Sequence, residues 1–200
     1  ALLDGGTPPR VLARLESPPL SELLTVMNRR SHNLFAEAIL RTLGRVVEGE
    51  GSFEGGSHVV QRFLVHDVGV PAEEARPVDG SGLSPTNRVS PYAFVRILEH
   101  MAGSEWSEVF SETLPQAGDW RGLRRMYRSP AAGNLRAKTG TIERVSALSG
   151  VVRGRRGERF LFSIISNDVP STSAAKRVED RIGIRLASFW RPATVTDSEE

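Results

Sequence analysis

The sequence predicts a mixed α/β fold of the α+β kind, in which helices pack on an antiparallel sheet. Apolar residues recur at helical spacing through most of the first 113 residues. Three apolar runs of strand length then follow between residues 135 and 166, the last two joined by a glycine-bounded turn. A further helical pattern closes the chain. Helices, then a strand meander, then a packing helix favour an α+β arrangement.

The first elements are expected to be a connecting segment and two helices. Residues 1–19, rich in Pro and Gly, predict the connection, with one short strand over 11–15. Helices are predicted over 20–28 and 28–44, and Gly44 stands where a helix end favours glycine. The apolar residues of the second helix recur at helical spacing and are expected to be its core face: Leu34, Phe35, Ala38, Ile39 and Leu43.

Three more helices are expected before the sheet. The first runs from Ser57 to Gly69, with Val59, Val60, Phe63 and Leu64 as its buried side. Residues 71–85 are expected to be irregular. Ser90-Pro91 predicts the next helix start, because Ser is a favoured cap and Pro suits the first helical position; this helix extends to residue 102. A short helix is expected over 105–113.

The sheet is predicted from three strands, over 135–142, 145–153 and 159–166. The turn at 154–157 makes the last two an antiparallel hairpin. A helix over 171–190 is expected to close the chain. Four residues fall on one side of this helix, and the apolar ones among them are expected to face the sheet: Val178, Ile182, Arg185 and Phe189.

Composition indicates a globular protein and excludes several kinds of site. Hydrophobic residues make up 39% of the 200 residues, which is enough for a core. The absence of cysteine excludes disulfides, thiolate metal sites and a cysteine nucleophile. A net charge of +2, scattered arginines and 6% aromatic residues give no indication of a nucleic-acid partner, and the dense run 153–157 is interpreted as a solvated turn. No transmembrane segment is predicted.

Lysine is the rarest cation in the chain, and its position is informative. Only Lys138 and Lys176 occur, against twenty-four arginines. The lysine ammonium is a compact point charge with a movable pKa, whereas the guanidinium is a wide and permanently charged fork. Lys138 opens the run Lys138-Thr139-Gly140-Thr141, and Lys-Thr-Gly is one of the three elements of penicillin-recognising serine enzymes. We therefore interpret Lys138 as a residue that takes part in the chemistry of a site. The alternative is that Lys138 is a solvent-exposed lysine on a strand.

Two other motifs accompany this run. Ser31-His32-Asn33 is expected at a helix start, where Ser and Asn could also be simple caps. Asp79 to Ser84, a glycine-rich loop, either supports the site or contacts substrate. Together, and in this order, the three motifs resemble the class C low-molecular-mass penicillin-binding proteins, the D-alanyl-D-alanine carboxypeptidase/endopeptidase family. The resemblance implies part of a penicillin-binding-protein or β-lactamase-like transpeptidase domain.

The resemblance also implies roles for individual residues. Acyl transfer needs a nucleophile with a base, a proton donor for the leaving amine and an oxyanion hole. The catalytic residues would be Ser31, which relays a proton, Asn33, whose amide binds the substrate backbone, and Lys138, which supplies positive potential.

The substrate-binding residues would follow Lys138 on its strand. The hydroxyl of Thr139 would bind the substrate carboxylate, Gly140 would leave room for a peptide at the strand edge, and the Thr141 N–H would be an oxyanion donor. His32 stands where aspartate is more familiar. The other histidines, His58, His66 and His100, lack metal-ligand spacing.

The family's nucleophile, in Ser-x-x-Lys, has no match before Ser31. The one literal match, Ser173 to Lys176, comes after Lys138 and is interpreted as accidental. We therefore expect residues 20–192 to be the C-terminal part of the transpeptidase-like domain, 1–19 to return from missing upstream domains, and 193–200 to be a tail. The chain alone is expected to be inactive.

The resulting prediction is part of a serine-type D-Ala-D-Ala carboxypeptidase/endopeptidase. Its partners would be peptidoglycan stem peptides, with β-lactams as inhibitors of the complete enzyme, and no metal or organic cofactor is implied. The expected location is periplasmic or otherwise extracytoplasmic, with any signal upstream. The alternatives are a non-catalytic peptidoglycan-binding module on the same fold and a β-lactamase-like hydrolase.

Overall fold

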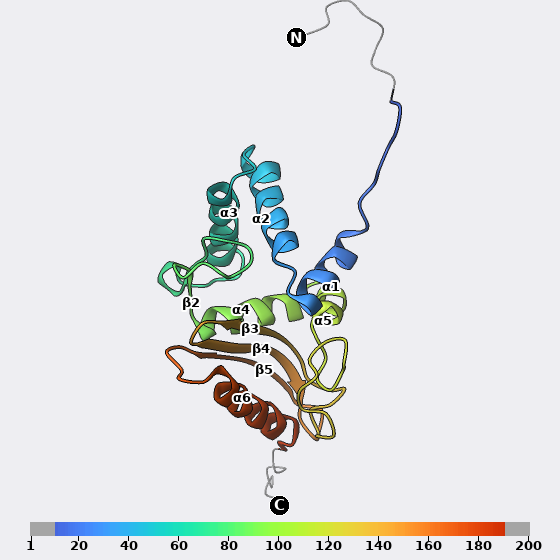
Figure 1. Ribbon diagram of the computed structural model, residues 1–200, viewed down its shortest axis with the longest axis vertical. Coiled ribbons are helices and arrows are strands. Elements are labelled where there is room, and N and C mark those ends of the chain that lie inside the picture. Colours follow the sequence, from blue (N-terminus) through green and yellow to red (C-terminus); the bar gives the residue numbers. More distant parts are fainter. Residues whose placement is uncertain (1–10, 191–200) are drawn as a thin grey trace, which may run out of the picture.

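A three-stranded antiparallel sheet, in the order β3-β4-β5, forms the centre of the lower part of the molecule (Figure 1). A computed structural model describes residues 11–190 of the chain. Helix α4 covers one face of the sheet and α6 covers the other (Figure 1). These elements are β3 (Arg136–Ile142), β4 (Val145–Arg153), β5 (Arg159–Ser166), α4 (Pro91–Ala102) and α6 (Thr172–Ala187).

The register of the sheet places the core on the side of α6. Ala137 of β3 pairs with Gly150 of β4, and Leu148 of β4 pairs with Ile164 of β5. Every second residue of β4 from Ser146 to Val152 is buried, as expected for a strand with one fully covered face. Apolar residues of the sheet, of α6 and of the segment before β3 form one core: Ala117, Leu123, Met126, Ala131, Leu135, Ala137, Leu148, Val152, Phe162 and Ala187.

Two helices, α2 (Asn33–Glu48) and α3 (Phe53–His66), form an antiparallel pair in the upper part of the molecule (Figure 1). Helix α1 (Leu20–Arg30) packs on α5 (Ser107–Thr113), with Asn28 Nδ2 donating to Thr113 Oγ1 at 2.8 Å. The remaining elements are a 3₁₀ turn η1 (Ala72–Glu74) and a small antiparallel pair, β1 (Ala75–Arg76) with β2 (Arg88–Val89). The sequence predicted no regular structure for η1 and β1, which lie within residues 71–85.

The strand predictions and the start of α4 are confirmed. Strands β4 and β5 have the predicted bounds and β3 begins one residue later than predicted. Ser90 Oγ accepts from the Ala93 N–H at 3.1 Å, with Pro91 as the first helical residue. Helix α5 begins at Ser107, two residues after its predicted start.

Glycines in the upper helices misled the prediction of helix ends. Helix α2 passes through Gly44 and ends at Glu48, with Gly49 in the left-handed region at φ 80°. Gly44 is needed for packing, because a Cβ there would lie 2.6 Å from the backbone nitrogen of Gly56. Helix α3 begins at Phe53 instead of Ser57, capped by Ser52 Oγ.

The expected core face of α2 is wrong. Leu34 is 70% exposed, and Leu43 and Ala38 are also exposed, whereas Leu40 and Gly44 are buried. The cause is the close approach of α3, which favours the small residues of both helices over the largest ones. On α3, Leu64 is buried as predicted, but Phe63 is exposed.

The predicted stripe of α6 is also wrong. Val178 is 49% exposed, and the buried residues lie at a spacing of four: Ala175, Glu179, Gly183 and Ala187. Small residues allow close packing, since a Cβ at Gly183 would lie 2.8 Å from Leu135 Cδ1. The helix itself spans fewer residues than predicted, with Ser171 as its cap.

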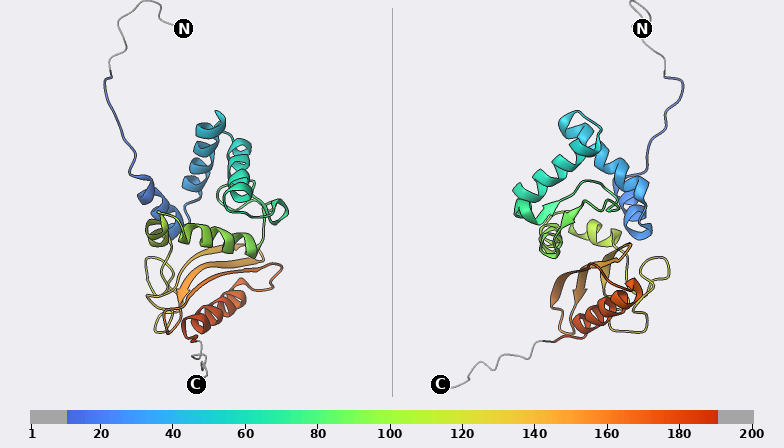
Figure 2. Two further views of the ribbon diagram at one scale, coloured as in Figure 1. Left: turned by 180° about the vertical axis from the view of Figure 1, so that it is seen from behind. Right: turned by 60° about the vertical axis from the view of Figure 1, so that its left-hand side comes forward.

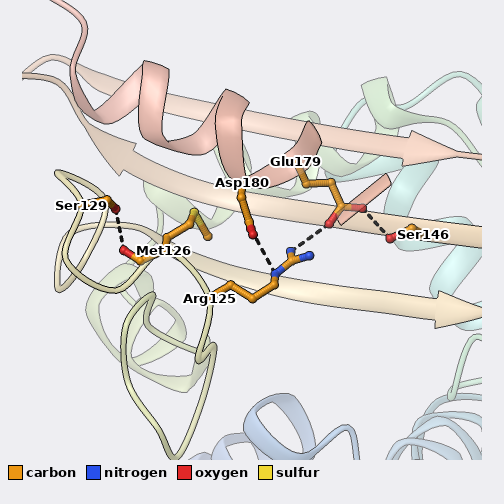
Figure 3. A network of polar contacts seen from close by, with 6 residues as sticks. All are labelled: Arg125, Met126, Ser129, Ser146, Glu179 and Asp180. Carbon is orange, nitrogen blue, oxygen red and sulfur yellow. Dashed lines mark hydrogen bonds and ion pairs between the residues drawn. The ribbon is translucent and has the colours of Figure 1, made fainter. Parts of the chain in front are cut away.

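Glu179 is buried at 1% exposure and is fully partnered (Figure 3). Its carboxylate accepts from Ser146 Oγ at 2.6 Å and from Arg125 Nη2 at 2.8 Å. Arg125 Nε also lies 3.1 Å from Asp180 Oδ1. Burial raises the pKa of Asp180, while Arg125 opposes the rise and Glu179 adds to it. This network joins α6, β4 and the segment before β3.

The connecting segment is irregular where the structure describes it. Residues 11–19 have no regular structure, so the strand expected over 11–15 is absent, and Leu15 is 99% exposed. The backbone of a lone strand would have no neighbour to pair with. Residues 1–10 and 191–200, which include the predicted tail, lie outside the described residues. Among residues 11–190, no helix has the length and apolar character needed to cross a bilayer.

Candidate active site

A sharp break between α1 and α2 presents Ser31. The sequence predicted a boundary between two helices at residue 28, with Ser31 at the start of the second; in the structure α1 ends at Arg30 and α2 begins at Asn33. Ser31 adopts the left-handed conformation, with φ 50° and ψ 54°. This conformation is unfavourable for a residue other than glycine and is concentrated at functional sites. The backbone therefore sets the direction of the Ser31 hydroxyl.

Ser31 and Lys138 meet, although 107 positions separate them in the sequence. Lys138 Nζ donates to Ser31 Oγ at 2.7 Å and to the Thr139 carbonyl oxygen at 2.7 Å. Lys138 pairs with Ser149 on β4, so its side chain lies on the face opposite the one that packs on α6. The contact brings two of the three sequence motifs together.

The electrostatic environment of Lys138 is unusual for a cation in this protein. Within residues 11–190, no carboxylate forms an ion pair with its ammonium group. Burial lowers the pKa of Lys138 below its ordinary value of 10.5, because desolvation disfavours the charged form. A desolvated ammonium with only neutral partners can attract an anion and can exchange a proton with the adjacent hydroxyl.

The outer edge of β3 is open beyond its first residues. The Ala137 N–H donates to the Pro115 carbonyl on this edge. Since alternate residues of an antiparallel strand face the same edge, the backbone groups of Thr139 and Thr141 also face it. No backbone partner pairs with the N–H groups of these two threonines within the described residues. An extended peptide can therefore add to this edge.

Gly140 keeps the surface beside Lys138 open. Residues 138 and 140 lie on the same face of β3, because side chains alternate along a strand. A Cβ at Gly140 would meet only Ala147 Cβ, at 3.4 Å, so packing does not require glycine here. The absence of a side chain instead leaves space next to the ammonium group.

Asn33 and His32 complete the motif at the helix start. Asn33 is the first residue of α2, is exposed, and makes no side-chain hydrogen bond within the described residues. The cap is His32, whose Nδ1 accepts from the Phe35 N–H at 3.3 Å. Neither the Ser31 nor the Asn33 side chain caps α2, whereas Ser31 is the C-cap residue of α1 through its backbone.

The glycine-rich loop is attached to α2 by a residue that sequence reasoning missed. The Glu37 carboxylate accepts from the N–H groups of Gly80 and Ser81, at 2.9 and 3.0 Å. Asp79 holds the loop internally, accepting from Gly82 and Ser84. These contacts favour the interpretation that the loop supports the site over the interpretation that it contacts substrate. Nothing in the sequence pairs Glu37 with a loop 43 residues away, so no local signal could have identified it.

The accidental Ser-x-x-Lys lies apart from this site. Ser173 and Lys176 belong to α6, which covers the other face of the sheet from Lys138 (Figure 1). The structure therefore brings together Ser31 and the Lys138 to Thr141 strand, with Asn33 two residues from Ser31.

Comparison with known proteins agrees with this geometry. Residues 4–188 match the model of the D-Ala-D-Ala carboxypeptidase 3 (S13) family. A D-alanyl-D-alanine carboxypeptidase of Actinomadura sp. (strain R39) is 36% identical over 185 residues, covering 90% of this chain and 34% of that protein. Carboxypeptidase DacB of Mycolicibacterium smegmatis is 35% identical, covering 85% of this chain and 38% of that protein. The chain thus spans about a third of the length of these relatives.

Solved structures show the same fold. Penicillin-binding protein 4 (DacB) of Haemophilus influenzae, in complex with a β-lactam, superposes with a TM-score of 0.73 at 26% identity and covers 86% of this chain and 42% of that chain. The TLA-1 β-lactamase shares the fold at a TM-score of 0.57 and 18% identity. With a family model that matches nearly the whole sequence, the chain belongs to the D-Ala-D-Ala carboxypeptidase S13 family.

Proposed function

We propose that this chain is the part of a serine-type D-Ala-D-Ala carboxypeptidase/endopeptidase that binds the peptidoglycan stem peptide and moves protons during acyl transfer. The observation that carries the proposal is the 2.7 Å contact between Lys138 Nζ and Ser31 Oγ beside an open strand edge. The family match supports the reaction class. The nucleophile comes from a Ser-x-x-Lys segment that this sequence lacks ahead of Ser31.

The proposed steps use groups in the described site. The free carboxylate of the substrate lies near Lys138 and the Thr139 hydroxyl, and the peptide adds along β3 past Gly140. When the nucleophile attacks the carbonyl carbon, its hydroxyl proton passes to the lysine of its own Ser-x-x-Lys segment, and the Thr141 N–H donates to the developing oxyanion. Ser31 then passes a proton to the leaving D-alanine nitrogen and takes one from the Lys138 ammonium in return. Asn33 binds the substrate backbone through its amide. The extracytoplasmic location belongs to the same proposal, since the substrate lies there.

Acylation by a labelled penicillin tests this function in a longer form of the protein that includes Ser-x-x-Lys. We expect the label on the serine of that segment, and Lys138→Met to slow acylation by about 10²–10⁴-fold. Lys176→Met, which changes the other lysine on α6, is the matched control and should acylate at the original rate. Mass spectrometry that locates the label on Ser31 or Ser173 would contradict the assignment.

Binding of acetyl-D-Ala-D-Ala to this chain alone tests the site without the nucleophile. The dipeptide should shift the amide resonances of Thr139 and Thr141, and Lys138→Met should abolish the shift. If the dipeptide binds but a longer form with Ser-x-x-Lys is never acylated, the non-catalytic binding module is the correct function. If nothing binds at β3, the substrate site is wrong.

A further inference from the structure

Exposed aromatic rings and arginines gather where β4 ends and β3 begins. Trp120 and Tyr127 are 67% and 65% exposed, in the segment that leads to β3, and Trp190 is 48% exposed after α6. Six exposed arginines lie in the segment that leads to β3 and at the turn between β4 and β5: Arg121, Arg124, Arg128, Arg153, Arg155 and Arg156. We name these nine residues the arginine–aromatic surface.

Contacts within and beside these segments fix their positions. A Cβ at Gly118, two residues before Trp120, would lie 3.5 Å from the Tyr127 Cα. Asn134 Nδ2 donates to the Arg153 carbonyl at 2.8 Å, and the Arg155 N–H donates to the Phe189 carbonyl at 2.8 Å. The views in Figures 1 and 2 show the segment before β3 at the same end of the sheet as the last turn of α6.

Charge is concentrated on this surface. Residues 119–128 contain four arginines, of which Arg125 is paired with Glu179, and one acidic residue, Asp119. Residues 153–158 contain three arginines and one acidic residue, Glu158, which accepts from the Arg156 N–H at 3.0 Å. The six exposed arginines exceed the net charge of the whole chain, which is +2. The partner that fits this surface is therefore an anion, and an extended one.

The rings indicate which kind of anion. Each exposed ring already has a guanidinium over it: Arg121 lies 4.8 Å from the Trp120 centroid, Arg128 lies 5.6 Å from Tyr127, and Arg156 lies 5.2 Å from Trp190. A base or sugar that stacks on these rings would have to compete with the guanidinium for the face. Trp and Tyr rings that enter the headgroup region of a bilayer by their edges keep the guanidinium in place, and that guanidinium is then beside the lipid phosphates.

We propose that the arginine–aromatic surface docks this protein on an anionic lipid bilayer. Arginines bind the phosphates, and Trp120, Tyr127 and Trp190 enter the headgroup region. The docking is peripheral and reversible, because it uses side chains of folded loops. It is independent of the chemistry at Lys138.

Flotation of the full chain with vesicles tests this proposal. Vesicles of phosphatidylcholine containing phosphatidylglycerol should bind the chain, with a blue shift of tryptophan fluorescence, and phosphatidylcholine alone should not. The triple variant Arg121→Gln, Arg124→Gln, Arg128→Gln should weaken binding on the order of a hundredfold, since each arginine near an anionic surface contributes to attraction. Trp120→Ala should weaken it by about tenfold.

Trp106→Ala is the matched control, because Trp106 is 60% exposed but lies outside the surface. It should bind as the original chain does. Three results would overturn the proposal: no binding to the anionic vesicles, an equal loss in Trp106→Ala, or displacement by soluble polyphosphate with no dependence on Trp120. The last result would assign the surface to a soluble polyanion. Far-UV circular dichroism checks that each variant is folded.

Discussion

The interior beside the sheet and the open edge of β3 each hold a desolvated charge, but the two charges have different partners. In the interior, the charge of Glu179 is fully partnered by Ser146 and Arg125. At the edge, the charge of Lys138 is desolvated and has only neutral partners. A buried charge with complementary partners maintains the structure, whereas a desolvated charge without a counterion is available for a ligand. Four predictions test whether this distinction holds.

The largest effect is expected from Glu179→Ala in the interior. The substitution leaves Arg125 partly buried with one carboxylate partner fewer, so the free energy of unfolding should fall by about 3–5 kcal/mol. Urea denaturation measures the change. As a control, Asp168→Ala removes the exposed partner of Arg144 and should cost less than about 1 kcal/mol. Equal losses in the two variants would show that the buried network is not special.

The next largest effect on stability is expected from substitution of a glycine in the sheet, Gly150 on β4, compared with Gly140 on β3. A Cβ at Gly150 in the interior would lie 2.1 Å from the Arg136 carbonyl oxygen, so Gly150→Ala should destabilise the fold by about 1–3 kcal/mol. Gly140→Ala, at the edge, should leave the unfolding midpoint nearly unchanged and weaken binding of acetyl-D-Ala-D-Ala. The idea that Gly140 serves the ligand fails if its substitution lowers stability as much as that of Gly150.

A smaller effect on stability is expected from Lys138→Met. Removal of the desolvated ammonium should leave the free energy of unfolding unchanged or slightly higher at neutral pH, within about 1 kcal/mol. Lys176→Met again provides the comparison. A marked loss of stability in Lys138→Met alone would mean that Lys138 maintains the structure, and the contrast with Glu179 would then disappear.

The smallest effect is a pH dependence. Because the pKa of Lys138 is lower in the folded state than its ordinary 10.5, the unfolded state binds more protons between these two values. The stability of the original chain relative to Lys138→Met should therefore rise as the pH increases through the folded-state pKa toward 10.5. Denaturation of both chains at neutral and alkaline pH measures this. A relative stability that falls over this range would contradict the sign.

Sequence reasoning predicted the sheet well and the upper helices less well. Strand alternation and the Ser90-Pro91 start are local signals, so β4, β5 and α4 match their predictions. Gly44 was interpreted by local propensity as a helix end, but it serves, with Gly56, the contact between α2 and α3, which only the tertiary structure reveals. The stripe of α6 failed for the same reason, because burial of Glu179 depends on Arg125, 54 positions away.

The sequence predicted the residues of the candidate site but not the structural features that position them. Lys138 was identified by its rarity among arginines, and its contact with Ser31 confirms that the two motifs converge. The left-handed backbone of Ser31 and the attachment of the loop by Glu37 were not predicted. The Glu37 contact joins residues 43 positions apart, which no short motif encodes. The catalytic roles of Ser31, Asn33 and Lys138 stay predictions.

The open margin of β3 also has a cost for the solubility of the protein. Unpaired N–H and C=O groups that receive a guest peptide are equally able to pair with the same strand of another molecule. Natural sheets guard against such mispairing with lysine, and Lys138 is in the position to do so, since its ammonium group donates to the Thr139 carbonyl at this edge. Replacing it with an apolar residue would thus favour self-association.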